Sequence, residues 1–127
     1  MYKFDPSKKG PLDGLRVIDM SRLVAGNMLS LQLADYGAEV IKIEGPPRGD
    51  PLRDWIFSGV EVHWKVYGRN KKSIGLNLRE DGAKEVLLRL LDNADVLIEN
   101  FRPGTMEDIG LGPDVLLQRN PKLIIGR

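Results

Sequence analysis

One short stretch, residues 94–104, limits the possible folds of this chain more than any other. Its sequence, Ala-Asp-Val-Leu-Ile-Glu-Asn-Phe-Arg-Pro-Gly, begins as an apolar run and ends at a polar, aromatic and basic tip. A nearly all-apolar run of this length is typical of a strand that is buried on both faces, as strands of parallel sheets are. In open parallel sheets, ligands bind beyond the carboxyl ends of the strands. The stretch therefore predicts a parallel α/β sheet with a ligand site near residues 99–102.

The spacing of apolar residues predicts the remaining elements. Alternating or continuous apolar runs indicate strands at residues 15–20, 39–44, 73–78, 95–99 and 122–125. Apolar residues three or four positions apart indicate helices at residues 25–36, 83–94, 105–108 and 114–119. Strands that alternate with helices imply a parallel sheet with helices on its faces.

Local signals refine this outline. Gly37 stands where a left-handed helix cap is expected, and Glu80 and Asp81 precede a helix whose N-terminal dipole they favour. The sequence Thr105-Met106-Glu107-Asp108 is typical of a helix start that is capped by a threonine. Strict alternation at 73–78 predicts that Ile74, Leu76 and Leu78 share one face of their strand.

The connection at residues 45–72 is longer than a simple crossover needs, and such ordered loops are usually functional or flexible. Two interpretations of its basic residues stay open. Together with Asn70 they bind phosphates, or they form a solvated basic loop; these residues are Lys65, Arg69, Lys71 and Lys72. Its large aromatic residues are Trp55, Phe57 and Trp64. Three roles stay open for them: stacking on an adenine, shielding an acyl chain, or forming a small hydrophobic cluster under the loop. For the lone histidine, His63, packing or surface exposure is favoured over catalysis.

Composition excludes several classes of function. Of 127 residues, 42% are apolar, which suffices for one domain with a single core. The chain has 19 basic and 18 acidic residues, so no global field attracts nucleic acid or an anionic membrane. It has no cysteine and one histidine, so we expect neither a disulfide framework nor a metal site. Without a secretory signal or a membrane-spanning run, we expect a soluble, cytoplasmic protein.

Nucleotide-binding motifs are absent, but several strand ends carry polar groups. One glycine, Gly26, stands where the dinucleotide fingerprint requires three, although Glu44 resembles the acid that binds ribose in dinucleotide enzymes. The small residues Ala25 and Gly26 have two possible roles. They let a ligand approach the backbone amides, or they allow a helix to pack tightly against the sheet. Three carboxylates at strand ends either converge on one cleft or cap separate turns: Asp19, Glu44 and Glu99.

A set of motifs in a fixed order resembles the class III coenzyme A (CoA) transferases, the family of formyl-CoA and carnitine-CoA transferases. The motifs lie at residues 11–19, 25–26, 33–44, 49–50, 70–74, 94–96, 99–104, 110–112 and 120–124. The resemblance implies a Rossmann-like domain, an interlocked homodimer, and transfer of CoA between an acyl-CoA and a carboxylic acid through an aspartyl-CoA thioester. It implies no metal.

The resemblance also implies which residues contact CoA: Val24, Ala25, Lys72, Leu76, Arg79, Asn100, Phe101 and Arg102. Apolar side chains would pack on adenine and pantetheine, backbone amides near Ala25 and Asn100 would bind polar groups, and Lys72, Arg79 or Arg102 would pair with phosphates. Two positions differ from common family patterns: Gly45 stands where several members carry a basic residue, and Asp108 stands where many carry an arginine that reaches the CoA phosphates.

The resemblance implies that the catalytic aspartate lies beyond the position that matches Arg127. We therefore expect a flexible segment at 1–10, a CoA-binding part at 11–127, and no catalytic residue or activity in this chain alone. The last predicted strand would be an exposed sheet edge, which favours a longer natural protein or a partner that covers it. Two further interpretations stay open: a fragment of an α-methylacyl-CoA racemase, and a non-catalytic CoA-binding or structural remnant.

Overall fold

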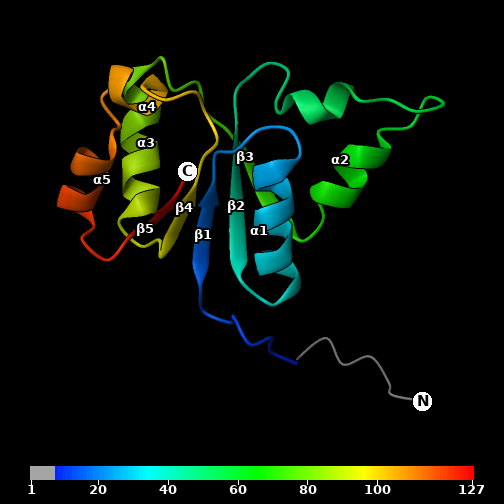
Figure 1. Cartoon of the computed structure of the whole chain (residues 1–127), viewed down its shortest axis with the longest axis horizontal. Helices are drawn as coiled ribbons and strands as arrows, with labels where there is room; N and C mark the ends of the chain where they lie inside the picture. The colour runs from blue at the N-terminus through cyan, green and yellow to red at the C-terminus, as the bar shows by residue number, and fades with distance from the viewer. Residues whose placement is uncertain (1–7) are drawn as a thin grey trace.

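Five parallel strands form one sheet at the centre of the molecule (Figure 1). The computed structural model describes residues 8–127. The strands are β1 (Arg16–Asp19), β2 (Glu39–Glu44), β3 (Lys71–Gly75), β4 (Val96–Ile98) and β5 (Ile124–Gly126). Their order across the sheet is β3-β2-β1-β4-β5, so the chain first adds strands on one side of β1 and then crosses to the other. The predicted parallel α/β fold is confirmed.

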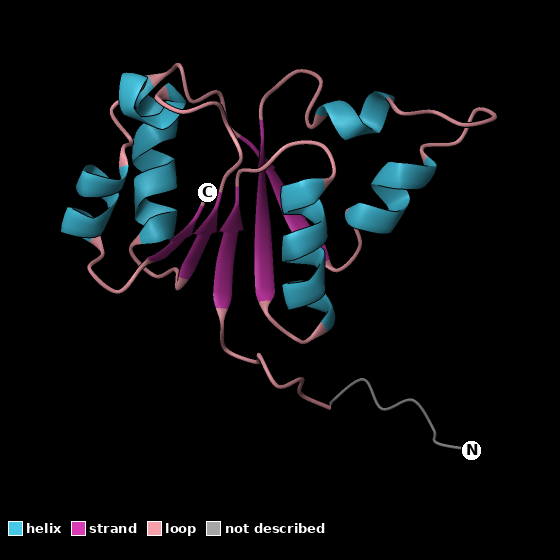
Figure 2. Cartoon of the chain, in the orientation of Figure 1, coloured by secondary structure: helices cyan, strands magenta, loops and turns pink. Residues whose placement is uncertain are grey.

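Helices cover both faces of the sheet (Figures 1 and 2). On one side lie α1 (Ala25–Asp35) and the short helix α2 (Val62–Tyr67), and on the other lie α3 (Asp81–Leu91), α4 (Thr105–Asp108) and α5 (Pro113–Arg119). Each crossover between neighbouring parallel strands must return over a face of the sheet, and right-handed crossovers on the two sides of β1 use opposite faces. The change of direction at β1 therefore produces the two helical layers.

Alternate residues of the central strands fill the two halves of the core. Val17 of β1 packs with the cluster under α1, and its neighbour Ile18 packs with the cluster under α3. Both side chains are fully buried. In β4, Leu97 and Ile98 divide between the two clusters in the same way. The prediction that this strand is buried on both faces is thus confirmed.

Two local predictions differ from the structure. The third strand was expected at 73–78, but β3 ends at Gly75 because its partner β2 ends at Glu44, opposite Gly75, before two prolines. Ile74, Leu76 and Leu78 still pack against one core cluster, as expected. Thr105 does not cap α4 with its side chain. The N-cap is Gly104, in a left-handed conformation with φ 89° that glycine adopts readily.

The predicted signals around the two long helices are confirmed. Gly37 follows α1 with φ 104°, and Glu80 and Asp81 begin α3. The last strand, β5, lies at an edge of the described sheet, as expected. Of the expected flexible segment 1–10, residues 1–7 lie outside the described residues. Gly10 packs so closely against the end of α1 that a Cβ there would lie 2.2 Å from the carbonyl oxygen of Tyr36.

The connection between β2 and β3 is folded. It contains a 3-10 helix, η1 (Pro51–Asp54), and α2, with an antiparallel bridge between Phe57 and Val60 in the turn that joins them. We call residues 51–67 the arm, because Figure 1 shows them extending beyond α1. Several apolar side chains of the arm are exposed: Trp55, Ile56, Phe57, Val60, Val62 and Val66.

Candidate functional site

A cavity of about 570 Å³ lies where four strands end. We call it the strand-end cavity. It is lined by residues 20–22 after β1, 43–50 at and after the end of β2, 76–79 after β3, and Phe101, Thr105 and Ile109 after β4. This location agrees with the rule that ligands bind outside the carboxyl ends of parallel strands, at the point where the strand order reverses. Here the order reverses between β1 and β4.

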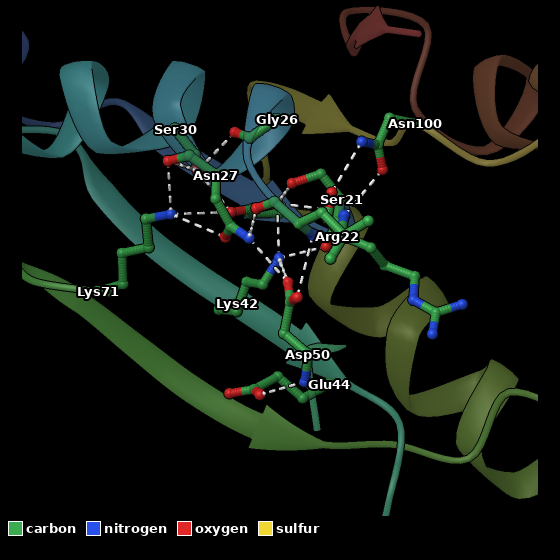
Figure 3. A network of polar contacts seen from close by, with 12 residues as sticks. Ser21, Arg22, Gly26, Asn27, Ser30, Lys42, Glu44, Asp50, Lys71 and Asn100 are labelled. Atoms are coloured by element: carbon green, nitrogen blue, oxygen red, sulfur yellow. Dashed lines mark hydrogen bonds and ion pairs between the residues drawn. The ribbon is translucent and has the colours of Figure 1, made fainter. Parts of the chain in front are cut away.

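The turns that follow β1 and β4 are joined directly at this point. The side-chain amide of Asn100 accepts a hydrogen bond from the backbone N–H of Arg22 at 2.8 Å and donates one to its carbonyl oxygen at 2.9 Å (Figure 3). The tip of the predicted ligand-binding strand therefore meets the turn before α1, as the sequence led us to expect. Asn100 fixes the backbone of Arg22 and leaves the arginine side chain free.

The loop after β2 holds the same turn from the other side. Leu23 has φ 63°, an unfavourable backbone region for a leucine, and its N–H donates to Oδ1 of Asp50 at 3.0 Å. The Asp50 carboxylate also accepts hydrogen bonds from the N–H of Leu52 and the side chain of Asn27. Burial raises the pKa of Asp50, but these hydrogen bonds outweigh it, so the pKa lies below its usual value.

A buried charge network lies beneath the turn (Figure 3). The Lys42 side chain is 1% exposed, and its Nζ lies 3.3 Å from Asp19 and 3.2 Å from Asp50. Lys71 Nζ lies 3.2 Å from the other oxygen of Asp19 and also donates to the backbone oxygen of Asn27. Burial lowers the pKa of Lys71, against the opposing effect of Asp19. Because buried charges are tolerated only when paired, this network ties β1, β2, β3 and α1 together.

Glu44 lines the cavity but is committed to the fold. Its carboxylate makes a two-point ion pair with Arg53, with both distances 2.8 Å, and accepts hydrogen bonds from Ser73 and the N–H of Asp50. Burial opposes ionisation, yet these partners lower the pKa of Glu44 to about 2. The carboxylate is thus ionised and saturated with donors, so its likeness to a ribose-binding acid has no support here.

The structure brings most of the predicted CoA-binding residues to one edge of the sheet. Leu76, Arg79 and Phe101 line the cavity. Val24 and Ala25 begin α1 directly after the turn, and Asn100 holds that turn. Arg102 follows Phe101 but does not line the cavity.

Lys72 is not brought to this edge. Its Nζ lies 2.5 Å from Glu39, the first residue of β2, and therefore at the amino edge of the sheet. The expected basic cluster divides in the same way. Arg69 and Asn70 bind Asp35 at the end of α1, and Lys71 is buried against Asp19. Arg69, Lys71 and Lys72 are thus paired with three different carboxylates and do not surround one shared position.

Gly26 and the large aromatic residues of the arm do not line the strand-end cavity. A Cβ at Gly26 would lie 2.1 Å from the Cβ of Ser21, so this glycine allows tight packing of α1. His63 packs edge-on against Trp55, with ring centroids 5.5 Å apart, and Arg53 lies 3.8 Å from the ring centroid of Trp64. None of these aromatic rings lines the cavity, and Phe57 is 73% exposed, so neither an adenine platform nor a closed satellite core is formed.

The three strand-end carboxylates do not converge either. Asp19 accepts from the N–H of Ser21, Glu44 from that of Asp50, and Glu99 from that of Phe101. Each anchors its own turn, and only Glu44 lines the cavity.

Sequence reasoning missed the residues that build the network and part of the cavity lining: Lys42, Asp50, Arg22 and Arg48. One signal for Lys42 was available, because it is a charged residue inside a strand that is otherwise apolar between two glutamates. A lysine there must be buried and paired, or the strand must lie at a surface. Asp50, Arg22 and Arg48 lie in loops, where no periodicity marks them.

Two further findings limit the site. Within residues 8–127, no group of three or more histidine, aspartate or glutamate side chains is placed to hold a metal ion. Across the same residues, no helix is both long and apolar enough to span a membrane.

Comparison with known proteins supplies the family context. A profile of CoA-transferase family III matches residues 12–127. The chain is 46% identical to a probable fatty acyl-CoA transferase of Mycobacterium tuberculosis, Rv3272, over 97% of this chain and 32% of the relative. It is 45% identical to succinyl-CoA–D-citramalate CoA-transferase of Chloroflexus aurantiacus, over 92% of this chain and 30% of that protein.

Solved structures agree with the fold. The crystal structure of Rv3272 matches with a TM-score of 0.86 at 46% identity, covering 92% of this chain and 34% of that one. A CAIB/BAIF family protein from Brucella suis matches with a TM-score of 0.86 at 37% identity, covering 93% of this chain and 33% of that one. The chain thus spans about a third of the length of the proteins it matches.

Proposed function

Because this chain belongs to CoA-transferase family III, we propose that it binds CoA or an acyl-CoA in the strand-end cavity, as part of an enzyme that transfers CoA between carboxylic acids. The observation that carries the proposal is the meeting of the β1 and β4 turns at the reversal of strand order, beside a cavity with both apolar and cationic lining. CoA needs both kinds of surface, since its pantetheine is largely uncharged and its phosphates are anionic.

The proposed roles follow from the positions of the residues. Leu76 and Phe101 contribute apolar residues to the cavity lining, and Arg79 contributes a cationic one. Asn100 is a positioning residue, because both ends of its amide are used by the backbone of Arg22. Ala25 is exposed at the first turn of α1, where unpaired backbone N–H groups favour an anion. We leave Lys72 out of the proposed contacts.

We further propose that the nucleophile of the reaction, an aspartate that forms a thioester with CoA, is not among the described residues. The carboxylates that line the cavity are Glu44 and Asp50, and both are saturated by hydrogen bonds and ion pairs. A nucleophilic carboxylate needs a free oxygen that faces the thioester carbonyl. The chain alone is therefore expected to bind CoA without transferring it.

Calorimetric titration tests the binding step. We expect CoA to bind the chain at one site and an acyl-CoA to compete with it. Arg79→Gln should weaken binding by about tenfold, the effect of losing one charge-assisted hydrogen bond. The matched control is Arg89→Gln, which removes an exposed arginine of α3 outside the cavity. Absence of CoA binding would refute the proposal.

The inactivity of the chain is tested separately. The chain is mixed with an acyl-CoA and a free carboxylic acid, and the CoA esters are separated by chromatography. We expect no new ester. Transfer of CoA by the chain alone would show that the nucleophile is a residue of this chain, and would contradict the proposal. The homodimer and the cytoplasmic location implied by the resemblance stay predictions, and cell fractionation would test the second.

A further inference from the structure

The charged groups that line the strand-end cavity are unequally paired. Five charged residues line it: Arg22, Glu44, Arg48, Asp50 and Arg79. The two acids are neutralised by cations outside the lining, because Arg53 pairs with Glu44 and Lys42 pairs with Asp50. By contrast, within residues 8–127 no ion pair is formed by any of the three arginines. The lining therefore carries three uncompensated positive charges.

The three arginines come from three neighbouring turns. Arg22 follows β1, Arg48 follows β2 and Arg79 follows β3, and these strands are adjacent in the sheet. Neighbouring strands lie about 5 Å apart, so the three strand ends span about 10 Å. Three cations that line one cavity from adjacent turns suit a ligand with more than one phosphate group better than a single carboxylate.

The backbone under two of the arginines is fixed. Asn100 binds both the N–H and the carbonyl oxygen of Arg22, and Figure 3 shows the guanidinium of Arg22 pointing away from the buried network. Arg48 lies in a tight turn that is closed by a 2.9 Å hydrogen bond from the N–H of Gly49 to the carbonyl oxygen of Gly45. A backbone that is already fixed lowers the ordering cost of binding an anion, because only the side chain must still be ordered.

We propose that Arg22 and Arg48, together with Arg79, form a guanidinium clamp for the phosphate groups of CoA. This inference rests on the proposed function and adds Arg22 and Arg48 to the residues that bind the ligand. The planar guanidinium group binds phosphate oxygens through two parallel hydrogen bonds, which a lysine cannot reproduce. The clamp binds the nucleotide end of CoA and leaves the pantetheine arm to the apolar lining.

The test compares ligands with and without phosphates. CoA, dephospho-CoA and pantetheine are titrated calorimetrically into the chain and into Arg22→Gln, Arg48→Gln and the control Arg89→Gln. We expect each clamp variant to weaken CoA binding about 5- to 30-fold and to reduce its dependence on salt, since screening acts on the lost charge pair. Pantetheine affinity should stay unchanged in all variants, and Arg89→Gln should match the wild type with every ligand.

Three other results would overturn the clamp. If both clamp variants bind CoA with wild-type affinity, the clamp is wrong while the proposed function stands. If the clamp variants lose CoA and pantetheine binding equally, the arginines act on the fold and not on phosphates; thermal unfolding of each variant would show the same loss. If the wild type binds neither ligand, the proposed function and the clamp fail together.

Discussion

At the scale of single residues, Glu44 and Asp50 are charged residues of the cavity wall that have no carboxylate oxygen free for a reaction. Each of their four carboxylate oxygens accepts a hydrogen bond or ion pair from the protein. Side chains that are paired in this way stabilise the fold and shape the cavity wall, whereas the arginines of the lining form no ion pair among the described residues. Glu44 was visible in the sequence as a polar residue at a strand end and Asp50 was not, and only the partners of the two acids reveal this role.

Glu44 gives a prediction about acid stability. Its pKa is about 2 in the folded chain against an ordinary 4.5, so its contribution is complete above about pH 4.5 and is lost as the pH falls toward 2. This difference in pKa corresponds to about 3 kcal/mol. We expect Glu44→Gln to lower the free energy of unfolding by about that amount at pH 7 and by much less near pH 2.

Urea unfolding at a series of pH values measures this difference. The control is Glu85→Gln, whose side chain is 58% exposed and lies 3.7 Å from Arg119. Its curve should follow that of the wild type. A Glu44→Gln variant as stable as the wild type at pH 7 would contradict the assigned role.

At the scale of elements, the site depends on how closely α1 approaches the turn after β1. Gly26 lies one residue inside α1 and is buried against Ser21, which hydrogen-bonds Asp19 at the end of β1. This contact sets the height of the helix N-terminus over the sheet and so the position of residues 21–25. The sequence left open whether the small residues served a ligand or packing, and for Gly26 the contact distance decides for packing.

Two glycine-to-alanine substitutions test this contact with opposite expected signs. Gly26→Ala would place a Cβ 2.1 Å from that of Ser21, so we expect a loss of about 1 to 3 kcal/mol of stability. Gly82→Ala is the matched control in α3, where a Cβ meets nothing within 4 Å. It should be neutral or stabilising by up to about 1 kcal/mol, because alanine restricts the unfolded chain. Thermal unfolding would measure both changes, and equal stability of the two variants would refute the packing role.

At the scale of the whole molecule, the site and the arm lie on different parts of the same connection. Residues 43–50 line the cavity, and the arm that follows carries exposed apolar side chains, including Ile56 at 60% and Phe57 at 73% exposure. Exposed apolar groups that are neighbours in the chain favour association with other surfaces. Residues 43–50 of the connection thus line the cavity, while the arm exposes apolar surface that is open to contact with protein.

We therefore predict that the isolated chain self-associates through the arm. Light scattering coupled to size-exclusion chromatography should show species larger than a monomer at high concentration. The double variant Ile56→Ser/Phe57→Ser should shift the population toward monomer, because it removes apolar area from the contact. Tyr36→Ser is the control, since Tyr36 is 61% exposed but lies outside the arm. A wild-type chain that stays monomeric would contradict the prediction.

The sequence by itself determined the parallel sheet, the two long helices and the edge of the sheet at which the cavity lies. Apolar periodicity specifies these features locally: the run at 95–99 must be buried, and its tip must lie at a carboxyl edge. The ordered motifs also identified the family, and the profile match at residues 12–127 confirms it. Leu76, Arg79 and Phe101, which the family resemblance indicated, line the cavity, and their contact with CoA stays a prediction.

Only the tertiary structure decided which charges are free and which are paired. Lys72 and Arg79 look alike in the sequence, yet Lys72 is paired with Glu39 at the amino edge while Arg79 lines the cavity. Pairing joins residues far apart in the chain, such as Lys42 with Asp19 and Asp50 or Asn100 with Arg22, and no local pattern encodes such partners. Periodicity reports which face of an element is buried, whereas the chemistry of a site depends on which side chains from different elements meet.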